Sequence, residues 1–216
     1  MCYVSYKNLE DKTKIPTDCL IFVCSHNNLT ELPELPNLLN HLNCSNNKLT
    51  KLPELPKSLI HLDCSNNKLT ELPELPYLLK YLDCSYNNLK DLQKLPSLLV
   101  YLNCECNILN ELPKLPDSLR NIMCGRNKIE ELPKLPGLLV FLGCEKNNIK
   151  YLSYENLQII KKQIVDIVNL DFYISDDCDI SSDELDEEIN MSVLFNPFSS
   201  IYKSNIEFAL YICDNF

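Results

Sequence analysis

The sequence predicts a repeat protein of the α/β class: a solenoid with a parallel β-sheet on its concave face, extended, polyproline-like convex segments and a C-terminal helical cap. Three features that recur every 20 residues predict it: a cysteine, an asparagine and a pair of Leu-Pro dipeptides. The cysteines are Cys24, Cys44, Cys64, Cys84, Cys104, Cys124 and Cys144. The asparagines are Asn27, Asn47, Asn67, Asn87, Asn107, Asn127 and Asn147.

The period divides the 216 residues into three parts. Residues 1–18 are a degenerate copy that we expect to cap the first coil, because terminal repeats of a solenoid are usually atypical. Residues 19–152 hold seven 20-residue repeats with the pattern L-x-x-L-x-C-x-x-N-x-L-x-x-L-P-x-L-P-x-x. Residues 153–216 lose the period, and we expect a cap helix, an acidic loop and a short terminal helix there.

The first half of each repeat predicts a short strand whose alternate residues point into the core. In the second repeat the core positions are Leu39, Leu42, Cys44, Leu49, Leu52 and Leu55. The asparagine column lies where the chain leaves each strand. We expect it to form a buried ladder that hydrogen-bonds backbone groups of adjacent coils. A solvated turn residue is the alternative, but every repeat keeps the asparagine.

The second half of each repeat carries two Leu-Pro dipeptides, and Gln93 alone replaces a first proline. Proline lacks an N–H donor and pushes the preceding residue into extended geometry. We therefore expect extended rather than helical convex segments.

After Leu152 the apolar spacing changes to that of a helix near 154–170, with Ser153 as its N-cap. Its apolar face would hold Leu157, Ile160, Ile164 and Ile167. We expect this helix to cover the last coil; a dimerising helix is the alternative, although two heptads are short for a coiled coil.

The acidic run 176–188 is typical of a solvated loop, since it lacks the ligand order of an EF-hand calcium site. Ser204 and Glu207 form a capping box for a short terminal helix.

The pattern LPxLPxxLxxLxxxxNxLxxLP resembles the short leucine-rich repeats of bacterial effectors of the YopM and IpaH/SspH families. The version rich in cysteine and asparagine most resembles leucine-rich-repeat proteins of mimivirus-like giant viruses. The resemblance covers residues 19–152 and implies the solenoid fold and an effector-like or viral role. IpaH-type effectors add a large ubiquitin-ligase domain with a catalytic cysteine. Residues 153–216 are too few for that domain, so the ligase role is not carried over to Cys178 or Cys213.

Composition limits the compartment and the partner. Seven of the 12 cysteines share one core position, so we expect reduced thiols and an intracellular location, in the cytoplasm, an infected host cell or a virion. We expect no signal peptide and no transmembrane segment. Residues 1–152 carry 17 Lys and Arg against 17 Asp and Glu, so no basic face for nucleic acid is expected.

The concave face is the candidate site for a protein or peptide partner, because tyrosine gives rigid contact area with a polar tip. The candidate residues are His41, His61, Asp63, Tyr81, Asp83, Tyr86, Tyr101 and Asn103. These side chains could also be present only to keep the strands soluble.

The histidines and one thiol are the residues that could support metal binding or catalysis. His41 and His61 are expected to be cross-strand neighbours beside Asp63, a set that could chelate zinc. Two imidazoles stacked by strand register occur more often without a metal, so no metal or cofactor is expected. Cys106 is the thiol expected to be exposed, but no histidine lies beside it to act as a base.

We therefore expect a non-catalytic protein-interaction module. The alternatives are a substrate-recruiting subunit of a ubiquitin-ligase-type complex, which would need residues 153–216 to dock a catalytic partner, and a structural or virion component. The oligomeric state does not follow from the sequence.

Overall fold

The computed structural model describes residues 2–5, 15–156, 158–160 and 189–190. The chain divides into two compact units, Met1–Ile129 with Pro133–Asn147, and Glu130–Leu132 with Asn148–Phe216. The acidic loop, the terminal helix, the cap-helix residues 157 and 161–170, and residues 6–14 of the N-terminal cap lie outside the described residues.

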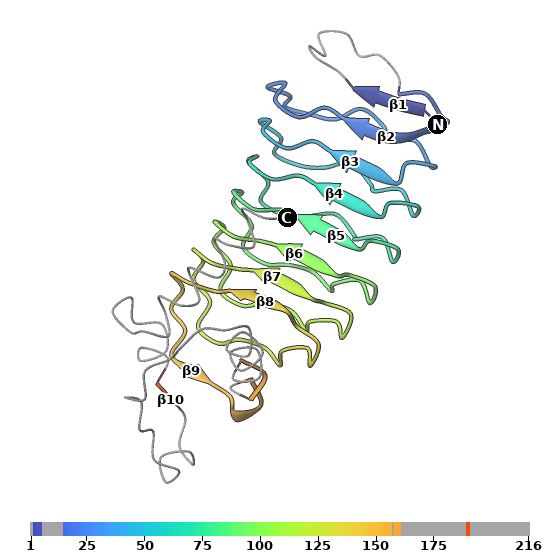
Figure 1. Ribbon diagram of the computed structural model, residues 1–216. Coiled ribbons are helices and arrows are strands. Elements are labelled where there is room, and N and C mark those ends of the chain that lie inside the picture. Colours follow the sequence, from blue (N-terminus) through green and yellow to red (C-terminus); the bar gives the residue numbers. More distant parts are fainter. Residues whose placement is uncertain (1, 6–14, 157, 161–188, 191–216) are drawn as a thin grey trace, which may run out of the picture. The chain divides into compact units, whose positions relative to one another are not determined.

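The first unit is a solenoid whose strands form one parallel sheet in chain order, as Figure 1 shows. Strand β1 (Cys2–Ser5) is followed by β2 (Cys19–Val23) and then by strands of three residues each. These are β3 (His41–Asn43), β4 (His61–Asp63), β5 (Tyr81–Asp83), β6 (Tyr101–Asn103), β7 (Asn121–Met123) and β8 (Phe141–Gly143). The predicted parallel sheet is confirmed, and β1 adds one strand before the first full repeat.

Each three-residue strand pairs with the next at a step of 20 residues, so equivalent residues stand directly side by side. His41 pairs with His61, Leu42 with Leu62 and Asn43 with Asp63. The middle residue points into the core, while its two neighbours lie on the outer side of the sheet, which we call the sheet face. The sheet face is the predicted concave face.

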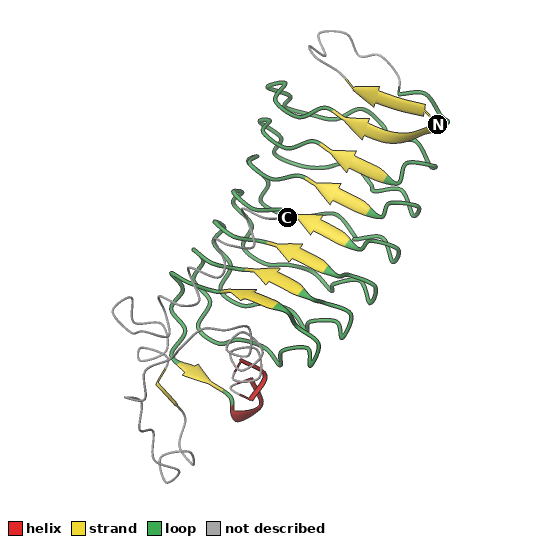
Figure 2. Ribbon diagram, viewed as in Figure 1, coloured by secondary structure: helices red, strands yellow, loops and turns green. Residues whose placement is uncertain are grey.

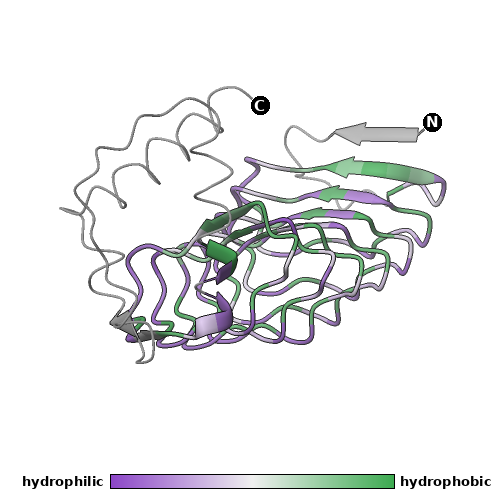
Figure 3. Ribbon diagram, turned by 60° about the horizontal axis from the view of Figure 1, so that its bottom comes forward, coloured by the Kyte–Doolittle hydropathy of each residue, from purple (hydrophilic) through white to green (hydrophobic). Residues whose placement is uncertain are grey.

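The core consists of columns of equivalent side chains, mostly leucine and cysteine, with Phe22, Ile122 and Ile129 as apolar replacements. The predicted core positions of the second repeat are all buried: Leu39, Leu42, Cys44, Leu49, Leu52 and Leu55. Figure 3 shows the matching alternation of hydrophobic and hydrophilic residues in successive coils. The seven column cysteines are free, buried thiols. Burial raises the pKa of Cys24 and of Cys124 to about 12, so these thiols stay protonated and pack as small apolar groups.

The convex segments are extended: residues 15–150 contain no helix, and Figure 2 shows loops opposite the strands. The second proline of each repeat begins a turn that returns the chain to the sheet. The Pro36 carbonyl accepts a 3.0 Å hydrogen bond from the Leu39 N–H, and Pro56 with Leu59 and Pro76 with Leu79 do the same. Proline fits this place because only its carbonyl is used.

The second unit contains the start of the predicted cap helix and a strand pairing that was not predicted. Residues 154–156 and 158–160 are helical, and the Ser153 hydroxyl accepts the Asn156 N–H at 3.3 Å. Strand β9 (Tyr151–Leu152) pairs antiparallel with β10 (Ile189–Asn190). No helix in the described part of the chain is long and apolar enough to cross a membrane.

Candidate interaction surface on the sheet

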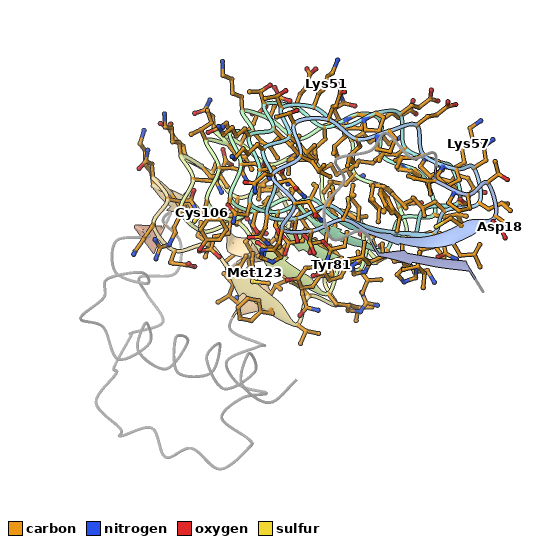
Figure 4. The ribbon with its side chains drawn as sticks, turned by 90° about the horizontal axis from the view of Figure 1, so that it is seen from above. Asp18, Lys51, Lys57, Tyr81, Cys106 and Met123 are labelled. Atoms are coloured by element: carbon orange, nitrogen blue, oxygen red, sulfur yellow. The ribbon has the colours of Figure 1, made fainter. Side chains whose placement is uncertain are left out.

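Four rings stand in one row on the sheet face, because the 20-residue register places the first residue of each strand beside its equivalent. This ring stack consists of His41, His61, Tyr81 and Tyr101 from β3 to β6. The ring centroids are 5.3, 4.0 and 4.3 Å apart, and the planes deviate by 15°, 8° and 2°. Figure 4 shows Tyr81 on the strand side of the coils and Lys51 on the opposite side.

Partial burial shifts the pKa of two rings in the stack, His61 and Tyr81. Burial lowers the pKa of His61, and the neighbouring His41 lowers it further. His61 is therefore neutral at pH 7. Burial also raises the pKa of Tyr81, and the nearby Asp83 carboxylate adds to that rise. The neutral forms of His61 and Tyr81 are thus favoured, and flat rings with polar tips suit protein recognition.

A second row, two residues further along each strand, consists of Asn43, Asp63, Asp83 and Asn103. We call it the Asx stripe. Each side chain bonds the backbone two residues later, which turns the chain out of the strand. Asp63 Oδ1 accepts the Ser65 N–H at 3.1 Å and the Ser65 hydroxyl at 2.7 Å. Sequence reasoning placed these residues on the face but missed this turn.

The two aspartates of the stripe carry charge in direct register. Asp63 pairs with Asp83 across β4 and β5. Burial raises the pKa of Asp83 and Asp63 raises it further, while hydrogen bonds from Ser85 and Asn103 oppose the rise. Within the described residues, neither aspartate forms an ion pair.

The asparagine ladder lies beneath this face and joins the coils. Asn67 Nδ2 donates to the carbonyls of Cys44, Cys64 and Ser65 at 3.0 to 3.1 Å, while its Oδ1 accepts the Leu49 N–H at 3.0 Å. The same pattern recurs at Asn87, Asn107 and Asn127. The amide supplies both a donor and an acceptor, and the position uses both.

Sequence reasoning missed a column in the left-handed backbone conformation. It holds His26, Asn46, Asn66, Tyr86, Cys106, Arg126 and Lys146, with φ between 51° and 59°. Asparagine tolerates this conformation better than most residues, so Asn46 and Asn66 were the residues from which the left-handed backbone could have been predicted. Tyr86, a predicted contact residue, is 54% exposed in this column.

Glycine matters at one place on the face. A Cβ on Gly125 would lie 2.5 Å from the Glu145 carboxylate, which therefore folds over this residue. Beside it, Arg126 Nε lies 3.4 Å from Glu105 Oε1.

The geometry of the histidines and of Cys106 differs from that of a zinc or nucleophile site. The His41 and His61 rings stack instead of converging on a point, and His41 Nδ1 lies 2.8 Å from Asn40 Oδ1. Among the residues described, no three His, Cys, Asp or Glu side chains are grouped to hold a metal ion. Burial raises the pKa of Cys106, which disfavours the thiolate that a nucleophile needs.

The combination of sheet, convex turns and inner ladder defines a repeat solenoid. The leucine-rich-repeat family model matches residues 38–59 and 58–77. The chain is 31% identical to a leucine-rich-repeat domain of a Shigella effector, with a TM-score of 0.60, and covers 77% of that domain and 69% of its own length. This chain belongs to the leucine-rich-repeat family.

Other solved structures are also similar to this chain. The chain is 36% identical to YopM from Yersinia enterocolitica WA-314, with a TM-score of 0.54 over 65% of this chain and 36% of YopM. It is 35% identical to the functional domain of InlJ from Listeria monocytogenes, which includes a cysteine ladder, with a TM-score of 0.57 over 66% of this chain and 33% of that one. The chain thus spans about a third of each. A comparison with curated protein sequences finds no match.

Proposed function

We propose that this protein is a non-catalytic interaction module that binds a protein or peptide partner on its sheet face. The ring stack carries the proposal: four stacked rings, half-buried or exposed, lie in one row on the face. Rigid aromatic area costs little side-chain entropy on binding, so such residues often dominate interfaces. The proposed contact residues are His41, His61, Asp63, Tyr81, Asp83, Tyr86, Tyr101 and Asn103.

An effector-like or viral role inside a cell is the setting we propose. One similar structure is described as a Shigella effector domain, and another as YopM, a leucine-rich effector protein from Yersinia pestis. The column of free cysteines is compatible with a reducing compartment. Nucleic acid and membranes are not proposed as partners.

Affinity capture with mass spectrometry tests the face. The native chain is compared with Tyr81→Ala/Asp83→Lys/Tyr101→Ala, and with Tyr77→Ala/Glu74→Lys as a convex control, since Tyr77 and Glu74 are exposed there. We expect a partner that the control retains and the face variant loses while both stay folded. A partner retained by the face variant would contradict the proposal and point to residues 153–216, as a recruiting subunit would require.

A further inference from the structure

In the Asx stripe, an asparagine and an aspartate make the same turn with the same hydrogen bonds. Asn43 Oδ1 accepts the Ser45 N–H and hydroxyl at 3.1 and 2.8 Å. Asp83 Oδ1 makes the same two bonds to Ser85 at 3.0 and 2.6 Å. A neutral amide therefore makes this turn as a carboxylate does. The negative charge at Asp63 and Asp83 is not needed to build the coil.

The charge also has a cost. Like charges directly opposite each other on neighbouring strands destabilise a sheet. Asp83 is partly removed from water beside the ring stack, and it keeps one hydrogen bond to its second oxygen, from Asn103 Nδ2 at 3.2 Å. In the described part of the chain, the one cation of this face that forms an ion pair is Arg126, and its partner is Glu105. Charges kept without a structural benefit are typical of a binding site.

We infer that Asp63 and Asp83, beside Tyr81 and Tyr101, receive an arginine side chain of the partner. This inference rests on the proposed function and names the chemistry of the partner. The two carboxylates lie one strand apart, about 4.8 Å, within reach of one planar guanidinium with five donors. Each aspartate uses Oδ1 for its turn and directs the remaining acceptor capacity of Oδ2 to the ligand.

Arginine fits this place better than lysine. A guanidinium is more weakly hydrated than an ammonium and bonds carboxylates through several donors at once, so it loses less on entering a partly desolvated site. The aliphatic stem of arginine can lie along the edges of the tyrosine rings. Phosphate groups would be repelled by the paired carboxylates.

The probe is N-acetyl-arginine amide, titrated at about 150 mM salt to screen distant charges, with amide and aromatic NMR spectra as readout. We expect saturable shifts at the Asp63 and Asp83 amides and the Tyr81 and Tyr101 rings. N-acetyl-lysine amide should bind several-fold more weakly, and the neutral citrulline analogue should give no saturable shift. Equal binding of the arginine and citrulline probes, or no saturation at the face, would overturn the inference.

The matched variants are Asp63→Asn/Asp83→Asn and Glu54→Gln/Glu74→Gln. Both remove two negative charges from two consecutive repeats, but Glu54 and Glu74 lie exposed on the convex segments. We expect the first pair to weaken arginine-amide binding at least tenfold and the second to leave it unchanged. Equal weakening by both pairs would mean that net charge alone attracts the probe, and the inference would fail.

The two proposals fail separately. A captured partner that is lost with Tyr81→Ala/Asp83→Lys/Tyr101→Ala but retained by Asp63→Asn/Asp83→Asn would leave the sheet face as the interface and remove the arginine site. Loss of arginine-amide binding in Asp63→Asn/Asp83→Asn, with a captured partner indifferent to both variants, would show that the aspartate pair binds a guanidinium but that this partner contacts another surface, so the sheet face would be removed as its interface.

Discussion

The asparagine ladder and the Asx stripe lie four residues apart in each coil, and both contain asparagine. The ladder position needs a donor and an acceptor, whereas the turn of the stripe needs only an acceptor. In the ladder, Asn67 donates to three carbonyls and accepts one backbone N–H. In the stripe, the turn uses only an acceptor, so aspartate replaces asparagine at Asp63 and Asp83. The buried column is fixed by the fold, while the surface column is free to vary with function.

The same substitution, asparagine to aspartate, should change the stability of the protein by very different amounts in the two columns. Asn67→Asp removes the donor to three buried carbonyls and buries a charge, so we expect a loss of about 3–5 kcal/mol of unfolding free energy. Asn43→Asp keeps its acceptor and should cost less than about 1 kcal/mol. Denaturant titration of both variants measures this; equal losses would refute the distinction.

The left-handed column lies between the Asx stripe and the asparagine ladder in sequence. Replacing a residue of this column should change stability in a direction that its tolerance of a positive φ predicts. Tyr86→Asn should stabilise the protein by about 1 kcal/mol, because asparagine tolerates a positive φ better than tyrosine. Asn66→Tyr should lose a similar amount. Melting temperatures of both, with Tyr86→Phe as the control for the lost hydroxyl, test the pair. A destabilised Tyr86→Asn protein would show that the tyrosine ring contributes more than the backbone conformation costs.

Neutralising one charge of the stripe should have a smaller, pH-dependent effect. The pKa of Asp83 is raised in the fold, so its contribution to stability is present below the ordinary carboxyl range and is lost as the pH rises through the raised pKa. Asp83→Asn should therefore be more stable than the native chain at pH 7, by about 0.5–1 kcal/mol, and the difference should shrink in acid. Chemical denaturation at several pH values measures it. A difference that grows in acid would contradict the sign.

The ring stack should show the smallest effect. Because the pKa of His61 is lowered in the fold, its contribution is present above the ordinary imidazole pKa and is lost as the pH falls below about 6.5. His61→Phe keeps the stack without this proton site, so its melting temperature should fall less than that of the native protein between pH 7 and pH 5. His26→Phe controls for a general histidine effect.

The period made much of this molecule predictable. A column that repeats every 20 residues, such as Leu42 or Cys44, shows its burial directly in the sequence. The role of the stripe was harder to predict, because Asp63 on a strand edge matches both a contact residue and a turn residue, and only hydrogen-bond geometry distinguishes the two. The left-handed column was missed because Tyr86 and Arg126 are not typical of that conformation. The pairing of β9 with β10 joins distant, non-repeating segments, so no local pattern announces it.

The ladder bonds of Asn67 reach Leu49 and Cys44, which lie 18 and 23 positions earlier, in the preceding coil. Every coil therefore presents the same docking edges, and a whole repeat could be inserted or removed without creating a new kind of junction. The length of the ring stack would then depend on the number of repeats. A duplicated 61–80 repeat would lengthen the stack by one ring, and a deleted one would shorten it.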